Sequence, residues 1–191
     1  LYSAAASDVY KRQGKAFCSG ADLSRMGASG SENRRSRGKT NQGLRRIQEL
    51  ASAIRNIPQP VIAAINGAAV GAGLSIALAS DIRIAAHKAR FSAIFVKRGL
   101  VPDTAASATI KEIAGHGIAA EMSLTGKLYD ADWALSKGLV NEVVEPSSLL
   151  EKCMEVAGEI AGNPPLAVRQ TKQLLRVRMQ DWNEIVSDED S

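Results

Sequence analysis

The sequence predicts an α/β fold with a helical C-terminal portion, and three observations support this prediction. Short apolar runs of the strand type alternate with segments of helical periodicity through the middle of the 191-residue chain. A segment rich in glycine and alanine directly follows the first of these runs, as in a strand-to-helix turn. Beyond about residue 147 only helical periodicity remains. Together these patterns indicate a layered α/β domain with helices at its end.

The individual elements follow from the spacing of apolar residues and from residues that stop helices. Apolar residues three and four positions apart predict helices, and short uninterrupted apolar runs predict buried strands. Pro58, Pro60 and Gly138 mark ends, and Asp103 or Thr104 is expected to cap the helix that follows. The expected helices cover 44–57, 74–79, 104–113, 131–137, 147–160 and 166–186, and the expected strands cover 61–65, 82–85 and 139–144.

The first thirteen residues, LYSAAASDVYKRQ, are set aside from the fold. They have no apolar periodicity, and AASDVYKRQ matches the translation of a transposase adapter used in sequencing libraries. We therefore expect residues 1–13 to be a non-native tag and the natural segment to begin near Gly14 as part of a longer protein. Residues 14–145 are expected to form a partial core, and 146–191 a helical region.

Composition restricts the classes of function. The net charge of +4 is mild, and the basic cluster within 34–39 lacks interleaved aromatic residues, so nucleic acid is not expected as a partner; a solvated loop, or a contact with ligand phosphates, is expected instead. Cys18 and Cys153 lack the spacing of a disulfide framework or a metal site. No apolar run approaches the length of a membrane span. We expect a cytoplasmic protein without a metal, with His87 and His116 on its surface.

Two segments carry the functional signal: GKAFCSGADL at 14–23 and INGAAVGAGLSIALASD at 65–81. In the second, Ala72 is expected at the start of a helix, where its backbone N–H has no intrahelical acceptor and can bind an anionic oxygen. The glycines also fit the start of a dinucleotide fingerprint, but Asp81 comes too early for the ribose-binding acid. A tight turn that needs small residues for packing alone is the third interpretation.

The chain resembles the enoyl-CoA hydratase/isomerase (crotonase) superfamily over nearly all of 14–175. The resemblance is carried by GKAFCSGADL, PQPVIAAINGAAVGAGLSIALASDIRIAA, FSAIFVKRGLVPDTAAS, LTGKLYDADWALSKGLVNEVV and NPPLAVRQTKQLL, in the family's order. It implies a crotonase-like spiral of ββα units, an acyl-CoA thioester as substrate with no separate cofactor, and trimers or dimers of trimers. It also implies that 146–191 is an incomplete trimerisation region.

Carried over by position, the resemblance assigns site residues. The oxyanion-hole donors are the backbone N–H groups of Ala21 and Ala72; alanine at 72, where the family commonly has glycine, requires a negative φ there. Residues expected to bind substrate and coenzyme A are Lys15, Ala16, Ser19, Asp22, Leu23, Gly71, Ser75, Phe95 and Pro102.

The acid/base residues depart from the hydratase pattern. Hydratases of the family use two glutamates, and the corresponding positions here are Ser75 and Phe95, neither of which is a general base at neutral pH. Asp103, in GLVPDTAAS, lies where double-bond isomerases of the family often place a single acid. A carboxylate in an apolar pocket has a raised pKa, which suits it to move a proton between two carbons. Capping of a helix is the alternative role for Asp103.

The leading hypothesis is therefore an enoyl-CoA isomerase in which Asp103 is the acid/base. Alternatives are a hydratase-type lyase with an atypical acid/base pair, dehalogenase-like thioester chemistry, and a non-catalytic member of the family that binds a nucleic acid or protein partner. The dehalogenase branch has a histidine on the preceding helix and a tryptophan beside the aspartate. Here Gln48 and Phe95 stand near those positions.

Overall fold

A computed structural model of the chain describes residues 8–10, 14, 16–20, 49–102 and 105–176. Two four-stranded sheets form its centre, with strand orders β1-β3-β5-β8 and β2-β4-β6-β7. The first sheet is parallel throughout, and the second is parallel except for the β6 and β7 pair. The strands are β1 (Asp8–Tyr10), β2 (Ala16–Cys18), β3 (Val61–Ile65), β4 (Ala68–Val70), β5 (Ile82–Ala86), β6 (Arg90–Ser92), β7 (Tyr129–Asp130) and β8 (Glu142–Val144).

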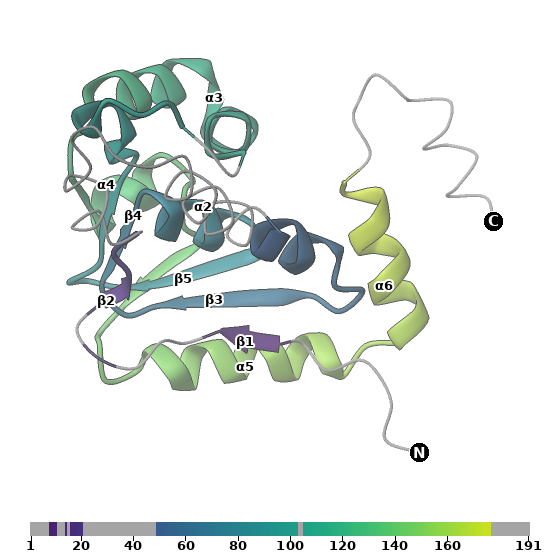
Figure 1. Ribbon diagram of the computed structural model, residues 1–191. Helices are drawn as coiled ribbons and strands as arrows, with labels where there is room; N and C mark the ends of the chain where they lie inside the picture. The colour runs from purple at the N-terminus through teal and green to yellow at the C-terminus, as the bar shows by residue number, and fades with distance from the viewer. Residues whose placement is uncertain (1–7, 11–13, 15, 21–48, 103–104, 177–191) are drawn as a thin grey trace, which may run out of the picture.

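From β1 to β6, successive strands alternate between the two sheets, and helices follow the pairs β3–β4 and β5–β6. After β3 and β4 comes α2 (Ala72–Leu78), and after β5 and β6 come the 3₁₀ helix η2 (Ile94–Arg98) and α3 (Ala106–Thr125). The helix α4 (Ala131–Ser136) lies between β7 and β8. This repeat is the predicted spiral of ββα units, seen in Figure 1 as helices stacked above the β3 and β5 strands.

The core has two faces because side chains alternate along β3. Ala63 and Ile65 belong to the main core, with Leu74, Phe91 and other residues of α2, α3 and β6. Ile62 and Ala64 point to the opposite face and pack against α5 (Leu149–Ala161). All five residues of β3 are buried, as its uninterrupted apolar run predicts.

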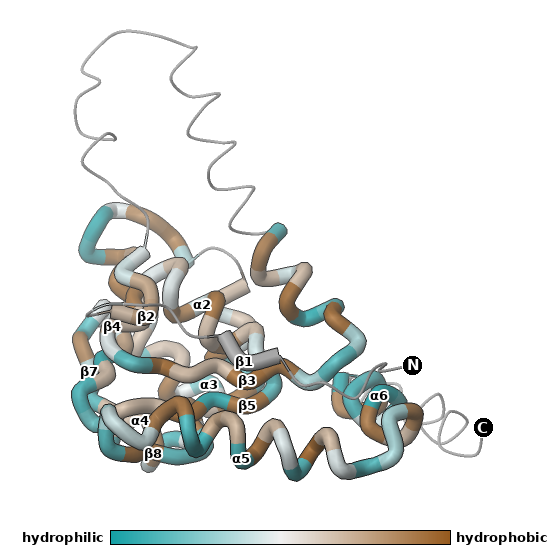
Figure 2. Tube along the Cα trace, turned by 90° about the horizontal axis from the view of Figure 1, so that it is seen from below, coloured by the Kyte–Doolittle hydropathy of each residue, from teal (hydrophilic) through white to brown (hydrophobic). Residues whose placement is uncertain are grey.

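The helix α5 covers the outer face of the first sheet (Figure 1). Its buried residues, Leu149, Cys153 and Ala157, recur every four positions. Figure 2 shows apolar and polar residues alternating along α5, as expected for a helix with one buried face. The last described helix, α6 (Pro165–Leu174), begins at a proline at its first position, where the missing N–H costs nothing.

An ion pair between a buried lysine and a partly exposed aspartate attaches α6 to the core. The Lys172 ammonium is 5% exposed; it lies 2.6 Å from the Asp81 Oδ2 atom and donates to the Gln59 carbonyl oxygen at 2.6 Å. Asp81 also accepts a hydrogen bond from the Val61 N–H at 2.7 Å. The carboxylate therefore ties the start of β3 to the C-terminal helix.

Most predicted elements are confirmed, but several bounds differ: the last helix, predicted over 166–186, ends at Leu174. The helix predicted to end at 113 runs to Thr125 across a kink at Gly115, which has a φ of 83°. Its N-cap is Ala105, so the helix begins after the predicted caps; Asp103 and Thr104 themselves lie outside the described residues. The strand predicted over 139–144 is confined to 142–144. Residues 8–10, set aside above, pair with β3 as β1, because an edge strand pairs through backbone groups.

The surface prediction for both histidines is confirmed, since the side chain of His87 is 50% exposed and His116 is exposed on α3. Within the part of the chain that the structure describes, no helix is both long enough and apolar enough to cross a membrane.

Candidate functional site

The two glycine and alanine segments lie side by side. The strand β2, from the first segment, pairs in parallel with β4, from the second, with Ala16 opposite Ala68 and Cys18 opposite Ala69. Both strands therefore run in the same direction toward the turn that begins α2. The parallel pairing of β2 with β4 supports the prediction that the two segments form one site.

Gly20 and Gly73 lack side chains, which lets the first segment lie close against the turn that begins α2. A Cβ atom added at Gly73 would overlap the Cys18 carbonyl oxygen and lie 2.7 Å from the Cys18 carbonyl carbon and Cβ. Gly20 has a φ of 93°, and a Cβ there would lie 3.0 Å from the Val70 carbonyl oxygen and 4.0 Å from the Ala72 nitrogen. The chain just before Ala21 thus lies beside Ala72.

The turn into α2 orients the backbone of Gly71 and Ala72. Gly71 is the N-cap, with a φ of 56°; its N–H donates to Ser92 O at 2.9 Å, and its carbonyl oxygen accepts from Leu74 N–H at 2.9 Å. Ala72 is the first helical residue, where an N–H lacks an intrahelical acceptor. Its φ is not positive, since Ala105 is the only non-glycine residue with positive φ in the described chain. The φ angle at Ala72 therefore meets the requirement predicted for alanine at this position.

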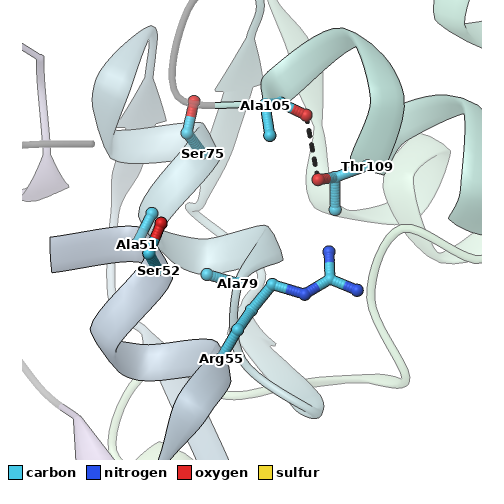
Figure 3. A pocket seen from close by; sticks show the side chains of 7 residues that line it. All are labelled: Ala51, Ser52, Arg55, Ser75, Ala79, Ala105 and Thr109. Carbon is cyan, nitrogen blue, oxygen red and sulfur yellow. Dashed lines mark hydrogen bonds between the residues drawn. The ribbon is translucent and has the colours of Figure 1, made fainter. Parts of the chain in front are cut away.

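A pocket of about 270 Å³ lies beside α2, between the helical residues 49–56 and the start of α3 (Figure 3). Ser75 is 3% exposed and its hydroxyl donates to the Gly71 carbonyl oxygen at 3.4 Å. The Thr109 hydroxyl donates to the Ala105 carbonyl oxygen at 2.9 Å. The described lining residues are Ala51, Ser52, Arg55, Ser75, Ala79, Ala105 and Thr109.

The remaining predicted binding residues lie in different environments. Phe95, on η2, is 5% exposed and belongs to the main core, close to the turn at Gly71. Pro102 and Ala16 are half-buried, and Ser19 is exposed. The structure brings Gly71, Ala72 and Ser75 together on one turn, with Phe95 beside them.

Five predicted site residues fall outside the described residues: Lys15, Ala21, Asp22, Leu23 and Asp103. Two of these residues, Ala21 and Asp103, have described neighbours in the sequence that contact the turn at Ala72 or line the pocket. Gly20 precedes Ala21 and lies against the turn at Ala72, and Ala105, two residues after Asp103, lines the pocket.

Arg55 and Thr109 line the pocket, although neither was predicted from the sequence as a site residue. Their helices were predicted from apolar periodicity, which identifies buried faces and not the polar residues at the edge of a pocket. Arg55 is the only ionisable residue among the described lining residues, and its Nη2 atom lies 3.5 Å from the Glu112 Oε2 atom. In the described part of the chain, no three His, Cys, Asp or Glu side chains are grouped as metal ligands.

The alternating two-sheet spiral, with a glycine turn set against a second glycine segment, defines a protein of the crotonase fold class. The chain belongs to the enoyl-CoA hydratase/isomerase family, whose sequence profile matches residues 9–190. The resemblance inferred from the motifs is thereby confirmed.

Individual relatives agree with this assignment. The chain is 39% identical to a short-chain-enoyl-CoA hydratase of Clostridium acetobutylicum over 167 residues, covering 87% of this chain and 61% of that protein. It is 35% identical to a crotonyl-CoA hydratase of Syntrophomonas wolfei, covering 87% of this chain and 62% of that protein. The chain thus spans about three-fifths of these curated relatives.

The fold is similar to that of solved structures. A crystal structure of an enoyl-CoA hydratase from Bacillus anthracis superposes with a TM-score of 0.87 at 34% identity, covering 95% of this chain and 69% of that one. The crotonase fold predicted from the sequence is confirmed.

Proposed function

We propose that this chain binds an acyl-CoA thioester and shifts its double bond, with Asp103 as the acid/base and the N–H groups of Ala21 and Ala72 as oxyanion donors. One observation carries the proposal. The pocket beside the Ala72 turn has no carboxylate among its described lining residues, and the two positions that carry glutamates in family hydratases hold a serine and a buried phenylalanine. Asp103 stands in the sequence two residues before Ala105, which lines this pocket.

The donors would act on charge that develops during the reaction. Removing a proton next to a thioester moves negative charge onto the thioester oxygen. A backbone N–H aimed at that oxygen contributes about 3 to 4 kcal/mol to the transition state, judged from the cost of deleting such a donor. Support for Ala72 comes from its place at the first helical position, and support for Ala21 from the contact of Gly20 with the same turn.

Isomerisation needs only one proton carrier. The base removes a proton from the carbon next to the thioester of a 3-enoyl chain, the charge spreads through the dienolate, and the same group returns the proton at the far carbon. A general acid/base serves this exchange best when its pKa lies near the working pH, and desolvation moves the pKa of a carboxylate in that direction.

A hydratase-type lyase is the second candidate. It is favoured by the curated relatives, which are named as hydratases. Water addition needs one group to activate water and another to protonate the second carbon. Neither the Ser75 hydroxyl nor the Phe95 ring can fill either role. A hydratase mechanism therefore requires a second acid from elsewhere in the protein.

We also propose that the protein assembles as a homotrimer or hexamer. Large apolar side chains are exposed around η2 and the end of α3, including Val101 at 81% and Leu124 at 75%. Exposed apolar groups clustered in this way mark protein interaction surfaces. Analytical ultracentrifugation should give three or six times the protomer mass; a monomer or dimer at micromolar concentration would contradict this proposal.

The activity test compares two substrates and two variants. Purified protein should convert a 3-enoyl-CoA to its conjugated 2-enoyl isomer and should add water to crotonyl-CoA far more slowly. Asp103→Asn should abolish isomerisation while acyl-CoA binding persists, and the matched control Asp132→Asn, at a side chain 78% exposed on α4, should retain the activity. Hydration faster than isomerisation would favour the second candidate and overturn the first.

A further inference from the structure

The pocket beside α2 has a polar end. Arg55 projects from the helical residues 49–56 and lies below Thr109 in Figure 3, while Ser75 lies at the other end near the start of α2. Ala79, one turn after Ser75, connects the two ends along α2. A ligand whose reactive end lies at the Ala72 turn would therefore extend toward the Arg55 guanidinium.

The described walls suit a short and polar acyl chain. They consist of three alanines, three hydroxyl residues and Arg55, without a large apolar side chain. The volume of about 270 Å³ equals roughly nine water molecules at about 30 Å³ each. A long alkyl chain would leave the hydroxyl groups and the guanidinium facing hydrocarbon, which is unfavourable for polar groups.

Arg55 has unused capacity for a ligand. Its contact with Glu112 is 3.5 Å long, and the two side chains are 39% and 59% exposed, so the pair contributes little to stability. A guanidinium carries five N–H donors in a planar fork that matches a carboxylate. One long contact with Glu112 leaves donors available on the pocket side.

Besides Glu112, a second guanidinium, that of Arg176, lies near this end of the pocket. Burial lowers the pKa of Arg176, nearby Asp81 raises it, and Arg55 lowers it further, so the two guanidinium groups repel each other. Asp81 lies 3.7 Å from Arg176 but is also bonded to Lys172. A carboxylate bound to Arg55 would reduce this repulsion.

We propose that Arg55 selects acyl-CoA substrates whose acyl chain ends in a carboxylate. The residue acts on specificity and takes no part in proton transfer. The inference rests on the proposed function, since it requires the acyl chain of a coenzyme A thioester to occupy the pocket.

The test uses two short enoyl-CoA thioesters of equal length, one ending in a carboxylate and one in a methyl group. The protein should have a kcat/KM at least tenfold higher for the carboxylate substrate, because a hydrogen bond to a charged group contributes about 1.5 kcal/mol or more and about 1.4 kcal/mol corresponds to a factor of ten. Arg55→Met should remove the preference, chiefly through a raised KM for the carboxylate substrate. Arg55→Lys should keep part of the preference for the carboxylate substrate.

Two control variants separate selection from a general charge effect. Glu112→Gln removes the competing carboxylate, so it should preserve or increase the preference. Arg169→Gln, at an exposed residue of α6, should leave the preference unchanged. Equal use of both substrates by the parent protein, or a preference that survives Arg55→Met, would overturn the inference.

Binding without turnover distinguishes this inference from the proposed function. Thioether analogues of the two substrates cannot form an enolate, and calorimetry reports their affinities. A carboxylate preference in binding that depends on Arg55, without turnover of any enoyl-CoA, would refute the proposed reaction and leave the role of Arg55 standing. Turnover of both substrates with equal analogue affinities, or no binding of either analogue, would refute the role of Arg55.

Discussion

Replacing Gly73 with alanine should separate the two segments that form the proposed oxyanion hole. The added Cβ would overlap the Cys18 carbonyl oxygen and lie 2.7 Å from the Cys18 carbonyl carbon, whereas ordinary contacts begin at 3.4 Å. The backbone of β2 and the start of α2 must therefore move apart by about 0.7 Å or more. Overpacking of this kind costs roughly 1 to 3 kcal/mol of stability.

The effect on function should exceed the effect on stability. The first segment carries the backbone that continues to Ala21, so the same displacement moves one donor away from the other. A misplacement of about 1 Å lowers catalysis by about 100-fold. We expect Gly73→Ala to remain folded in urea denaturation, with a reduced free energy of unfolding, and to lose at least this factor in enoyl-CoA isomerisation.

Gly158→Ala is the matched control. This glycine lies in α5, and nothing is within 4 Å of the position of an added Cβ. Alanine there should raise the free energy of unfolding by about 0.5 to 1 kcal/mol and leave activity unchanged. Full activity and stability in Gly73→Ala would refute the reasoning that this close approach forms the site.

Three further predictions concern the scaffold. Burial raises the pKa of Cys153 to about 11 from 9.0, so the folded state keeps the proton longer; between these pH values its contribution to the free energy of unfolding should fall by about 1.4 kcal/mol per pH unit. This slope should be absent from Cys153→Ala in parallel urea titrations, and equal slopes would contradict burial of the thiol. Asp130 accepts the Trp133 N–H at 2.8 Å as the N-cap of α4, so Asp130→Ala should cost about 1 kcal/mol, measured by thermal unfolding; an unchanged melting temperature would count against the cap. Asp81→Asn should cost about 2 to 3 kcal/mol because it weakens the ion pair with the buried Lys172, and urea denaturation without a change in midpoint would exclude this role.

The sequence predicts elements whose burial extends along the whole element. The five-residue apolar run 61–65 can only be a buried strand in this context, and it is one. β1 has no comparable signal, since its three residues join the sheet edge through backbone hydrogen bonds that most sequences can make. The sequence therefore could not distinguish this strand from an unstructured terminus.

Other features depend on tertiary contacts that have no local pattern. Ala105 adopts a φ of 58°, which is costly for alanine, so sequence rules place the helix cap at the preceding Asp or Thr. Arg55 follows the helical pattern of its neighbours, and only the packing of α2 and α3 shows that it lines a pocket. The glycines at 20, 71 and 73 are the strongest signal, because close contacts at Gly20 and Gly73 and the positive φ of Gly71 disfavour other residues.

Deuterium exchange into a bound substrate tests the central claim most directly. A 3-enoyl-CoA incubated with the protein in D₂O should gain deuterium at the far carbon, as read by mass spectrometry, to the extent that the protonated Asp103 carboxyl group exchanges with solvent before it returns the proton. Asp103→Asn should lower the exchange rate by at least 100-fold while Asp132→Asn retains it. Exchange that continues unchanged in Asp103→Asn would contradict the assignment of Asp103 as the acid/base.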